Sequence, residues 1–159
     1  MSIVVYLADM RHNYMHVLAS DAMPLNVGYM KAVMDRDLGG DCDVRIFAYP
    51  DRLLSAMRER APDVLMLSNY TWNEQISRYF ARLAKSMKPD TLVVMGGPNI
   101  HDEPERQKSF LAERPELDWY VLGEGDFLAT EIVQHFADSG LSIAALGQRD
   151  LPSSVYRRG

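Results

Sequence analysis

The sequence has 159 residues, 47% of them hydrophobic and 25% charged, with a net charge of −5, which is the composition of one globular domain with a buried core. It has no apolar run near the roughly 18–20 residues of a membrane-spanning helix, and its basic residues are scattered, so we predict neither a membrane protein nor a nucleic-acid-binding protein. The chain enters an apolar stretch without a basic leader and has a single cysteine, Cys42, which together favour a cytoplasmic protein without disulfides.

Five short, mostly apolar runs predict β-strands. Runs of this length without a helical period are typical of strands that are buried on both faces of a sheet. In chain order they cover residues 3–8, 44–48, 64–67, 92–95 and 117–122.

Segments with helical periodicity lie between these runs. Asp51 and Asn73 precede two of them and are expected to cap helices, since Asp and Asn favour the N-cap position. We expect Phe127 on the buried side of the last helix. In the helix after Asn73, the predicted buried stripe is Ile76, Tyr79, Phe80, Leu83 and Met87. The predicted helices cover residues 24–38, 51–60, 73–88, 105–113 and 126–137.

Strand and helix alternate five times, which predicts right-handed crossovers and a parallel sheet. The expected fold is therefore a three-layer, doubly wound α/β domain (Rossmann-like, flavodoxin-like), with a five-stranded parallel sheet and helices on both faces. We assign this domain to residues 1–138. Residues 139–159 are interrupted by Gly147 and Pro152, and we expect a linker or the start of a downstream domain there, without a sixth strand.

The loop after residues 92–95 is the first candidate for a binding site. Ligands of open parallel sheets bind where the strands end, at the carboxyl edge. Gly96 and Gly97 have no Cβ, so the loop can take positive φ and let another molecule approach the backbone, and Pro98 stiffens its exit. Asp9, Ser68 and residues 123–125 end other strands and are expected at the same edge.

Three common ligands of this architecture are poorly matched. A nicotinamide site needs Gly-x-Gly-x-x-Gly after a strand, but no glycine precedes Gly28. A flavin site needs a hydroxyl-rich phosphate loop after the first strand, and residues 9–13, DMRHN, are not one. A phosphate-accepting receiver domain needs an aspartate after the third strand and a lysine after the fifth, where this chain has Ser68 and Leu122.

Three segments together resemble a known family. They are residues 62–73 (PDVLMLSNYTWN), 93–98 (VVMGGP) and 123–125 (GEG), and they are similar to the cobalamin-binding domain at the front of cobalamin-dependent radical S-adenosylmethionine enzymes. Residues 24–29 (PLNVGY) look like the family's first-helix signature, and residues 155–157 look like the passage towards its barrel domain. The resemblance covers about residues 3–138.

The resemblance implies where cobalamin binds. The Ser68 hydroxyl and the Gly96–Gly97 backbone would hold the nucleotide tail of base-off cobalamin, with Gly123 and Gly125 on the tail's far side. The corrin ring would lie over the carboxyl edge, near the first loop and residues 70–72. The implied cofactor-binding residues are Asp9, His12, Ser68, Asn69, Tyr70, Trp72, Gly96, Gly97, Pro98, Gly123, Glu124 and Gly125.

Two assignments stay open. The family's Asp-x-His-x-x-Gly motif supplies a cobalt-ligating histidine, but here Asp9-Met10-Arg11-His12 is one residue out of register and no glycine ends the motif. His12 is therefore either the cobalt ligand or a polar loop residue. Tyr70 and Trp72 either pack against the corrin ring or are buried between the sheet and the following helix.

The resemblance also limits what this chain does alone. A radical S-adenosylmethionine enzyme holds a 4Fe-4S cluster with three cysteines, and this chain has one. We therefore expect the cluster and S-adenosylmethionine in a downstream domain or subunit, and a role here in presenting cobalamin for methyl transfer or another radical reaction. Two alternatives remain. One is a degenerate domain that binds proteins without a cofactor, through the edge that carries Glu124; the other is a small enzyme with Asp9, His12 and Glu124 as acid and base.

Overall fold

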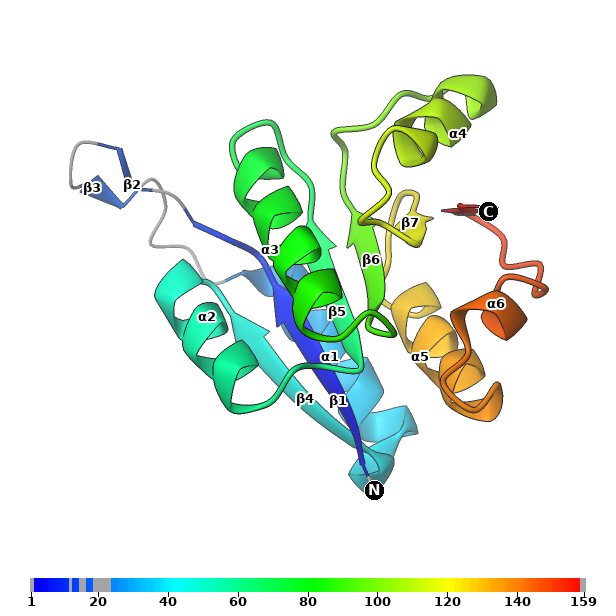
Figure 1. The fold of residues 1–159 in the computed structure, drawn as a ribbon, viewed down its shortest axis with the longest axis horizontal. Coiled ribbons are helices and arrows are strands. Elements are labelled where there is room, and N and C mark those ends of the chain that lie inside the picture. Colours follow the sequence, from blue (N-terminus) through cyan, green and yellow to red (C-terminus); the bar gives the residue numbers. More distant parts are fainter. Residues whose placement is uncertain (1, 12, 15–16, 19–23, 158–159) are drawn as a thin grey trace.

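The computed structural model describes residues 2–11, 13–14, 17–18 and 24–157. They form a three-layer α/β domain whose central sheet has six strands in the order β4-β1-β5-β6-β7-β8 (Figure 1). The strands are Ile3–Ala8 (β1), Cys42–Phe47 (β4), Val64–Ser68 (β5), Leu92–Gly96 (β6), Trp119–Val121 (β7) and Ser154–Tyr156 (β8), and a separate antiparallel pair joins Asn13–Tyr14 (β2) to Val17–Leu18 (β3).

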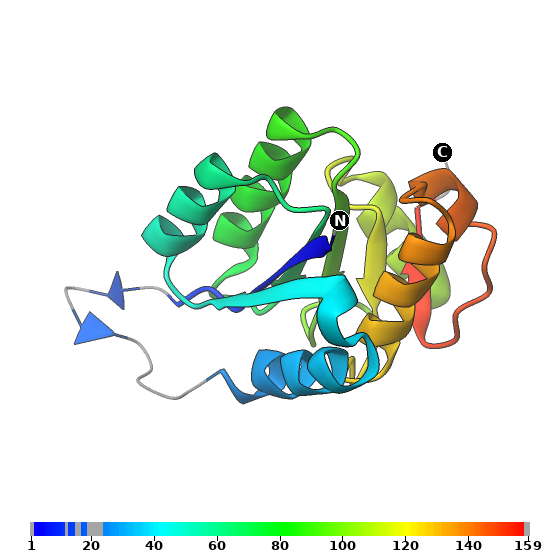
Figure 2. The ribbon, with the colours of Figure 1, turned by 90° about the horizontal axis from the view of Figure 1, so that it is seen from below.

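Helices cover both faces of the sheet, as the sequence predicts. Figure 2 shows α1 and α5 on one face and α2 and α3 on the other, where α4 also packs. Apolar side chains from the two sets of helices meet alternate residues of the strands and form two cores. The helices are Leu25–Asp37 (α1), Pro50–Glu59 (α2), Glu74–Met87 (α3), Pro104–Ala112 (α4), Leu128–Asp138 (α5) and Ile143–Leu146 (α6), with a short 3₁₀ turn at Gly39–Asp41 (η1).

The five parallel strands follow the flavodoxin-like order 2-1-3-4-5, which confirms the predicted doubly wound topology. Ser68 and Gly96, the last residues of β5 and β6, are partners in the ladder register. The loops that follow these two residues therefore begin side by side, which the predicted site requires.

The prediction of five strands without a sixth was wrong. β8 pairs antiparallel with β7, with Trp119 opposite Tyr156, and the two rings are 4.8 Å apart. A Cβ on Gly147 would lie 2.2 Å from the Tyr156 ring, so this glycine makes room for the tyrosine. The Arg157 backbone N–H donates to the carbonyl of Asp118. Three residues are too short for a periodic signal, and it is pairing with β7 that makes them a strand.

Neither residue predicted to cap a helix does so through its side chain. Asn73 occupies the predicted N-cap position of α3, but its side chain accepts a hydrogen bond from the Tyr70 backbone N–H at 2.8 Å and none from the first turn of the helix. Helix α2 begins at Pro50 with Tyr49 at the N-cap, which places Asp51 in the first turn. A proline with its φ already fixed suits the first helical position, and the N-cap lies two residues before the predicted one.

The predicted apolar face of α3 was rotated. In α3 the buried residues are Ser77, Phe80, Ala81 and Ala84, while Tyr79 and Met87 of the predicted stripe are exposed. Three of the four buried side chains, those of Ser77, Ala81 and Ala84, are small, and Phe80 is the one large side chain on this face. In α5, which begins at Leu128, two residues after the predicted start, Phe127 lies at the N-cap and is 64% exposed rather than buried, while the rest of the predicted face is buried.

Candidate functional site

A cavity of about 660 Å³ opens at the carboxyl edge of the sheet, on the face covered by α1 and α5. Its apolar wall comes from three parts of the fold, namely α1, the ends of β5 to β7, and α5. The apolar side chains on this wall include Val27, Met30, Met66, Val94, Val121 and Ala129. A largely apolar concave site of this size at the carboxyl edge is typical of binding sites for organic cofactors.

Most of the residues predicted from the sequence line this cavity. Its loop wall contains Ser68, Tyr70, Gly96, Gly97, Pro98, Gly123, Glu124 and Gly125. Three predicted residues do not line the cavity: Asp9, Asn69 and Trp72. Asp9 is hydrogen-bonded to Ser68, Asn69 follows Ser68 in the chain, and Trp72 stacks on Tyr70. His12 lies outside the described residues, so its assignment stays a prediction. Of the three residues suggested as acid and base, Glu124 lines the cavity, Asp9 does not, and His12 is the one outside the described residues.

The glycines of these loops are required for different reasons. Gly97 has φ +130°, and a Cβ there would lie 2.6 Å from the carbonyl oxygen of Asn69, so the protein's own backbone demands glycine. Gly123 has φ +68° and open space around it, so its missing side chain leaves the cavity rim free. A Cβ on Gly96 would meet Val121 at 3.4 Å, an ordinary contact. We expected Gly97 to serve ligand approach, and the structure adds a structural reason.

The Ser68 hydroxyl is held by two neighbours. It donates to Asp9 Oδ1 at 2.6 Å and accepts from Asn73 Nδ2 at 2.8 Å, while the Ser68 carbonyl accepts from the hydroxyl of Ser77. Because a serine hydroxyl has one proton, Ser68 can offer a ligand only an acceptor lone pair while this bond to Asp9 is intact. Asp9 therefore orients the serine and does not itself contact the cavity.

Two aromatic rings stand beside the cavity on the β5–α3 loop. Tyr70 and Trp72 are stacked, with centroids 4.5 Å apart and planes 5° from parallel. Trp72 is 57% exposed, so the alternative that it is buried between the sheet and α3 was wrong. Burial and the charge of Asp9 raise the pKa of Tyr70, which lines the cavity in its neutral form.

Sequence reasoning missed the part of the cavity formed by α1 and by the β6–α4 segment. Val27 lies within the PLNVGY segment that carried part of the resemblance and Met30 directly follows it, yet neither is among the predicted site residues. Gln107 was missed entirely; its side-chain amide donates to the carbonyls of His101 and Asp102 and so shapes the wall. No local pattern distinguishes such a wall from ordinary core.

The charged side chains that line the cavity are all acidic. Asp102, Glu124 and Asp126 are among its lining residues, and no lysine or arginine is present among the described residues that line it. A phosphate-rich mononucleotide would be repelled by this rim, whereas a neutral or cationic ligand with amide donors is compatible with it. No group of three or more potential metal-ligating side chains occurs within the described part of the chain.

Comparison with known proteins identifies the family. Residues 11–133 match the family described as "B12 binding domain", which is most of the chain. The chain belongs to the B12-binding domain family. It is 35% identical over 124 residues to a 2-(S-pantetheinyl)-carbapenam-3-carboxylate methyltransferase of Streptantibioticus cattleyicolor, and 33% identical over 125 residues to the cobalamin-dependent radical SAM methyltransferase TokK of Streptomyces tokunonensis. The recognised resemblance is thereby confirmed.

The matches cover 73% and 71% of this B12-binding domain, but only 17% and 18% of those two relatives. A solved cobalamin-binding protein from Desulfitobacterium hafniense has the same fold, with a TM-score of 0.58 and 14% identity over 84% of this chain and 58% of that one. The predicted fold class is confirmed, apart from the number of strands.

The cavity fits a B12 cofactor on physical grounds. Its apolar wall suits the flat base of a nucleotide tail, and the open space at Gly123 leaves room for a chain to pass over the backbone. The carboxylates at the rim can accept hydrogen bonds from the primary amides around a corrin ring.

In the described residues, no helix is long and apolar enough to cross a membrane.

Proposed function

We propose that this domain binds cobalamin in the base-off form and presents it to a radical S-adenosylmethionine enzyme. The observation that carries this proposal is the cavity at the carboxyl edge, with its apolar wall between α1, the sheet and α5. The nucleotide tail would lie against Ser68 and the Gly96–Gly97 backbone on one side, and against Gly123 and Gly125 on the other. The corrin ring would lie above, beside Tyr70 and Trp72.

Bound cobalamin would supply a cobalt-centred methyl carrier or radical partner, and the residues of this chain would bind and orient it. The 4Fe-4S cluster and S-adenosylmethionine would belong to a downstream domain or subunit, because the one cysteine of this chain cannot hold a three-cysteine cluster. Methyl transfer is the reaction class named for both relatives and is therefore our proposal for the parent protein. A cytoplasmic location stays a prediction.

Reconstitution with hydroxocobalamin tests the proposal. The purified chain should retain the corrinoid through gel filtration and show its visible absorption spectrum. Electron paramagnetic resonance of the cob(II)alamin form would report whether nitrogen ligates cobalt, and His12→Ala would test that histidine. Wild-type protein that retains no corrinoid would refute the proposal.

Gly96 offers a sharper variant than Gly97. Strand alternation places a Gly96 side chain on the same face as Val94, which lines the cavity. Gly96→Val should therefore fill the site and weaken hydroxocobalamin binding by about tenfold or more, the equivalent of roughly 1.4 kcal/mol. Gly40→Val is the matched control, since Gly40 is exposed before β4 at the opposite edge and a Cβ there meets nothing within 4 Å. Equal loss of binding in both variants would contradict the assignment.

The second candidate is a protein-interaction domain without a cofactor. Exposed apolar side chains near the cavity favour it, namely Leu25, Tyr29, Trp72 and Phe127. A pull-down with the parent protein's downstream region, in the absence of cobalamin, separates the two proposals. Capture by a chain that fails to retain hydroxocobalamin would favour the interaction domain.

A further inference from the structure

Asn69 joins the two loops that form one wall of the cavity, although it does not line the cavity itself. Its side chain is fully buried and donates to the carbonyl of Asn99 at 2.8 Å, and its Oδ1 accepts from Asn99 Nδ2 at 3.2 Å. The backbones are joined as well, because Asn69 N–H donates to Gly96 and Asn99 N–H donates to Asn69. The loops after β5 and β6 are thus fixed to each other by side chains and backbone together.

Tyr120 holds the same wall from the core. Its hydroxyl donates to the carbonyl of Gly97 at 2.8 Å and accepts from Asn69 Nδ2 at 3.0 Å. The tyrosine is fully buried, so the two partners satisfy its hydroxyl as both donor and acceptor. Gly97 lines the cavity with an unusual φ of +130°, and this hydrogen bond fixes the orientation of its peptide carbonyl.

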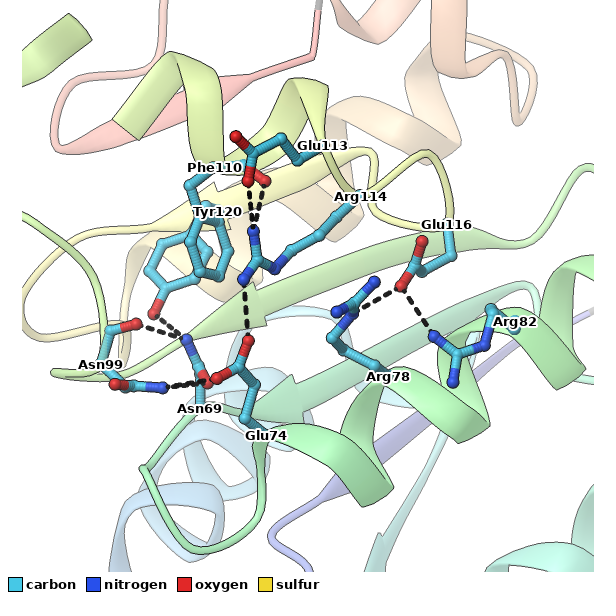
Figure 3. Close-up of polar contacts among 10 residues, drawn as sticks. All are labelled: Asn69, Glu74, Arg78, Arg82, Asn99, Phe110, Glu113, Arg114, Glu116 and Tyr120. Carbon is cyan, nitrogen blue, oxygen red and sulfur yellow. Dashed lines mark hydrogen bonds and ion pairs between the residues drawn. The ribbon is translucent and has the colours of Figure 1, made fainter. Parts of the chain in front are cut away.

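Three further residues close this arrangement into a ring (Figure 3). Glu74 accepts from Asn99 Nδ2 at 3.1 Å and from Arg114 at 2.9 Å. The Arg114 guanidinium lies 3.7 Å from the centroid of the Phe110 ring, which meets the Tyr120 ring edge-on at 5.4 Å. We call this ring the loop clamp; its members are Asn69, Glu74, Asn99, Phe110, Arg114 and Tyr120. None of them lines the cavity.

We propose that the loop clamp sets the affinity of the cavity for its cofactor by holding the Ser68 and Gly97 loops in the shape that admits it. The inference rests on the proposed function. It adds five positioning residues outside the predicted site, and it gives Asn69, which the resemblance implied as a cofactor-binding residue, a positioning role. A loop that samples several shapes binds more weakly in proportion to the fraction in the competent one. Buried, mutually satisfied polar groups are the means by which such a loop is fixed before the ligand arrives.

Tyr120→Phe is the direct test, because it removes only the hydroxyl and keeps the ring against Phe110. We expect the dissociation constant for hydroxocobalamin to rise about tenfold, mainly through a slower association rate. Thr91→Val is the matched control: it removes another buried hydroxyl that donates to a backbone carbonyl, that of Pro62, at the amino edge of the sheet. Both variants are compared at a temperature where circular dichroism shows them folded.

Glu74→Gln provides a second variant at the partly exposed side of the clamp. We expect it to weaken the affinity for hydroxocobalamin about threefold. If the clamp acts as one unit, the two effects are not independent. The double variant Glu74→Gln with Tyr120→Phe should then lose less affinity for hydroxocobalamin than the product of the two single-variant factors. Wild-type protein that binds no hydroxocobalamin would refute the proposed function and this inference with it. The loop clamp alone would be refuted if the wild-type protein binds hydroxocobalamin and the dissociation constant of Tyr120→Phe equals that of the wild type. A dissociation constant of Tyr120→Phe no higher than that of Thr91→Val would refute it as well.

Discussion

A Cβ added to Gly97 would lie 2.6 Å from the carbonyl oxygen of Asn69, which is closer than real Cβ contacts come. The contact is between two segments of backbone, so no side chain can move aside to relieve it. Glycine at this position is consequently a condition of the fold as well as of the cavity, and loss of cofactor binding in a Gly97 variant would not by itself identify a cofactor site.

We therefore predict that Gly97→Ala destabilises the protein in the absence of any corrinoid. The backbone conformation alone should cost roughly 1–3 kcal/mol of the free energy of unfolding, and the contact with Asn69 should add to it. Urea unfolding of the cofactor-free protein measures this change. Gly40→Ala, at an exposed position with open space, is the control and should change stability little. An unchanged unfolding midpoint in Gly97→Ala would contradict the prediction.

A second prediction concerns the C-terminal segment. A chain ending at Asp138 should expose Trp119, which is 1% exposed beside Tyr156 in the full chain. In a Trp72→Phe background Trp119 is the one tryptophan left, and its fluorescence emission should shift to longer wavelength on truncation. Emission that stays unchanged would support a domain that ends at residue 138.

A milder form of the same test uses single substitutions. Tyr156→Ala should lower the free energy of unfolding by about 1–3 kcal/mol, because the partly buried ring of Tyr156 packs on Trp119 and over Gly147. Tyr79→Ala is the comparison, since that ring is 51% exposed on α3. Equal effects on the urea midpoint would mean that β8 contributes little to stability.

The third prediction is an alkaline transition that belongs to Tyr120. Burial raises the pKa of this phenol from 10.0 to about 12, with the charge of Glu74 acting in the same direction and the hydrogen bond from Asn69 opposing it. Because the folded pKa lies above the unfolded one, the stability this group contributes is complete below pH 10 and is lost as pH rises towards 12. In an ultraviolet titration Tyr120→Phe should lack the last tyrosinate step, and an identical titration curve would contradict the assignment.

The fourth prediction is an acid-side loss of stability through Glu116. Burial of this carboxyl favours its neutral form, but hydrogen bonds from Arg78 and the backbone, with the charges of Arg78 and Arg82, outweigh it and lower the pKa. A lowered folded pKa gives stability that is present above pH 4.5 and is lost as pH falls further. Glu116→Gln should therefore cost about 1–3 kcal/mol at neutral pH and flatten the acid-side decline.

The control for that measurement is Glu105→Gln. Glu105 pairs with Lys108 on α4, where both side chains are well exposed, and such pairs contribute little. The free energy of unfolding of Glu105→Gln between pH 3 and 7 should follow that of the wild type. A Glu116→Gln profile as steep as this control would show that the Arg78–Glu116–Arg82 group does not govern acid stability.

The sequence by itself determined the layers of the fold and the edge that carries the site. Buried runs such as residues 64–67 and 92–95 predicted parallel strands because a strand covered by helices on both faces leaves a local apolar signature. The loops at Ser68, Gly96 and Gly123 were placed at one edge for the same reason, since parallel strands end together. The resemblance in these loops then identified the family correctly.

Tertiary structure alone decided how each of those residues is used. The proton of Ser68 is committed to Asp9, Gly97 is required by the Asn69 backbone, and Trp72 is exposed. The sixth strand and the loop clamp were also invisible, because both are made by residues far apart in the chain. Local sequence patterns report burial and backbone preference. The hydrogen bond between Tyr120 and Gly97 exists only after the sheet has brought these two residues together.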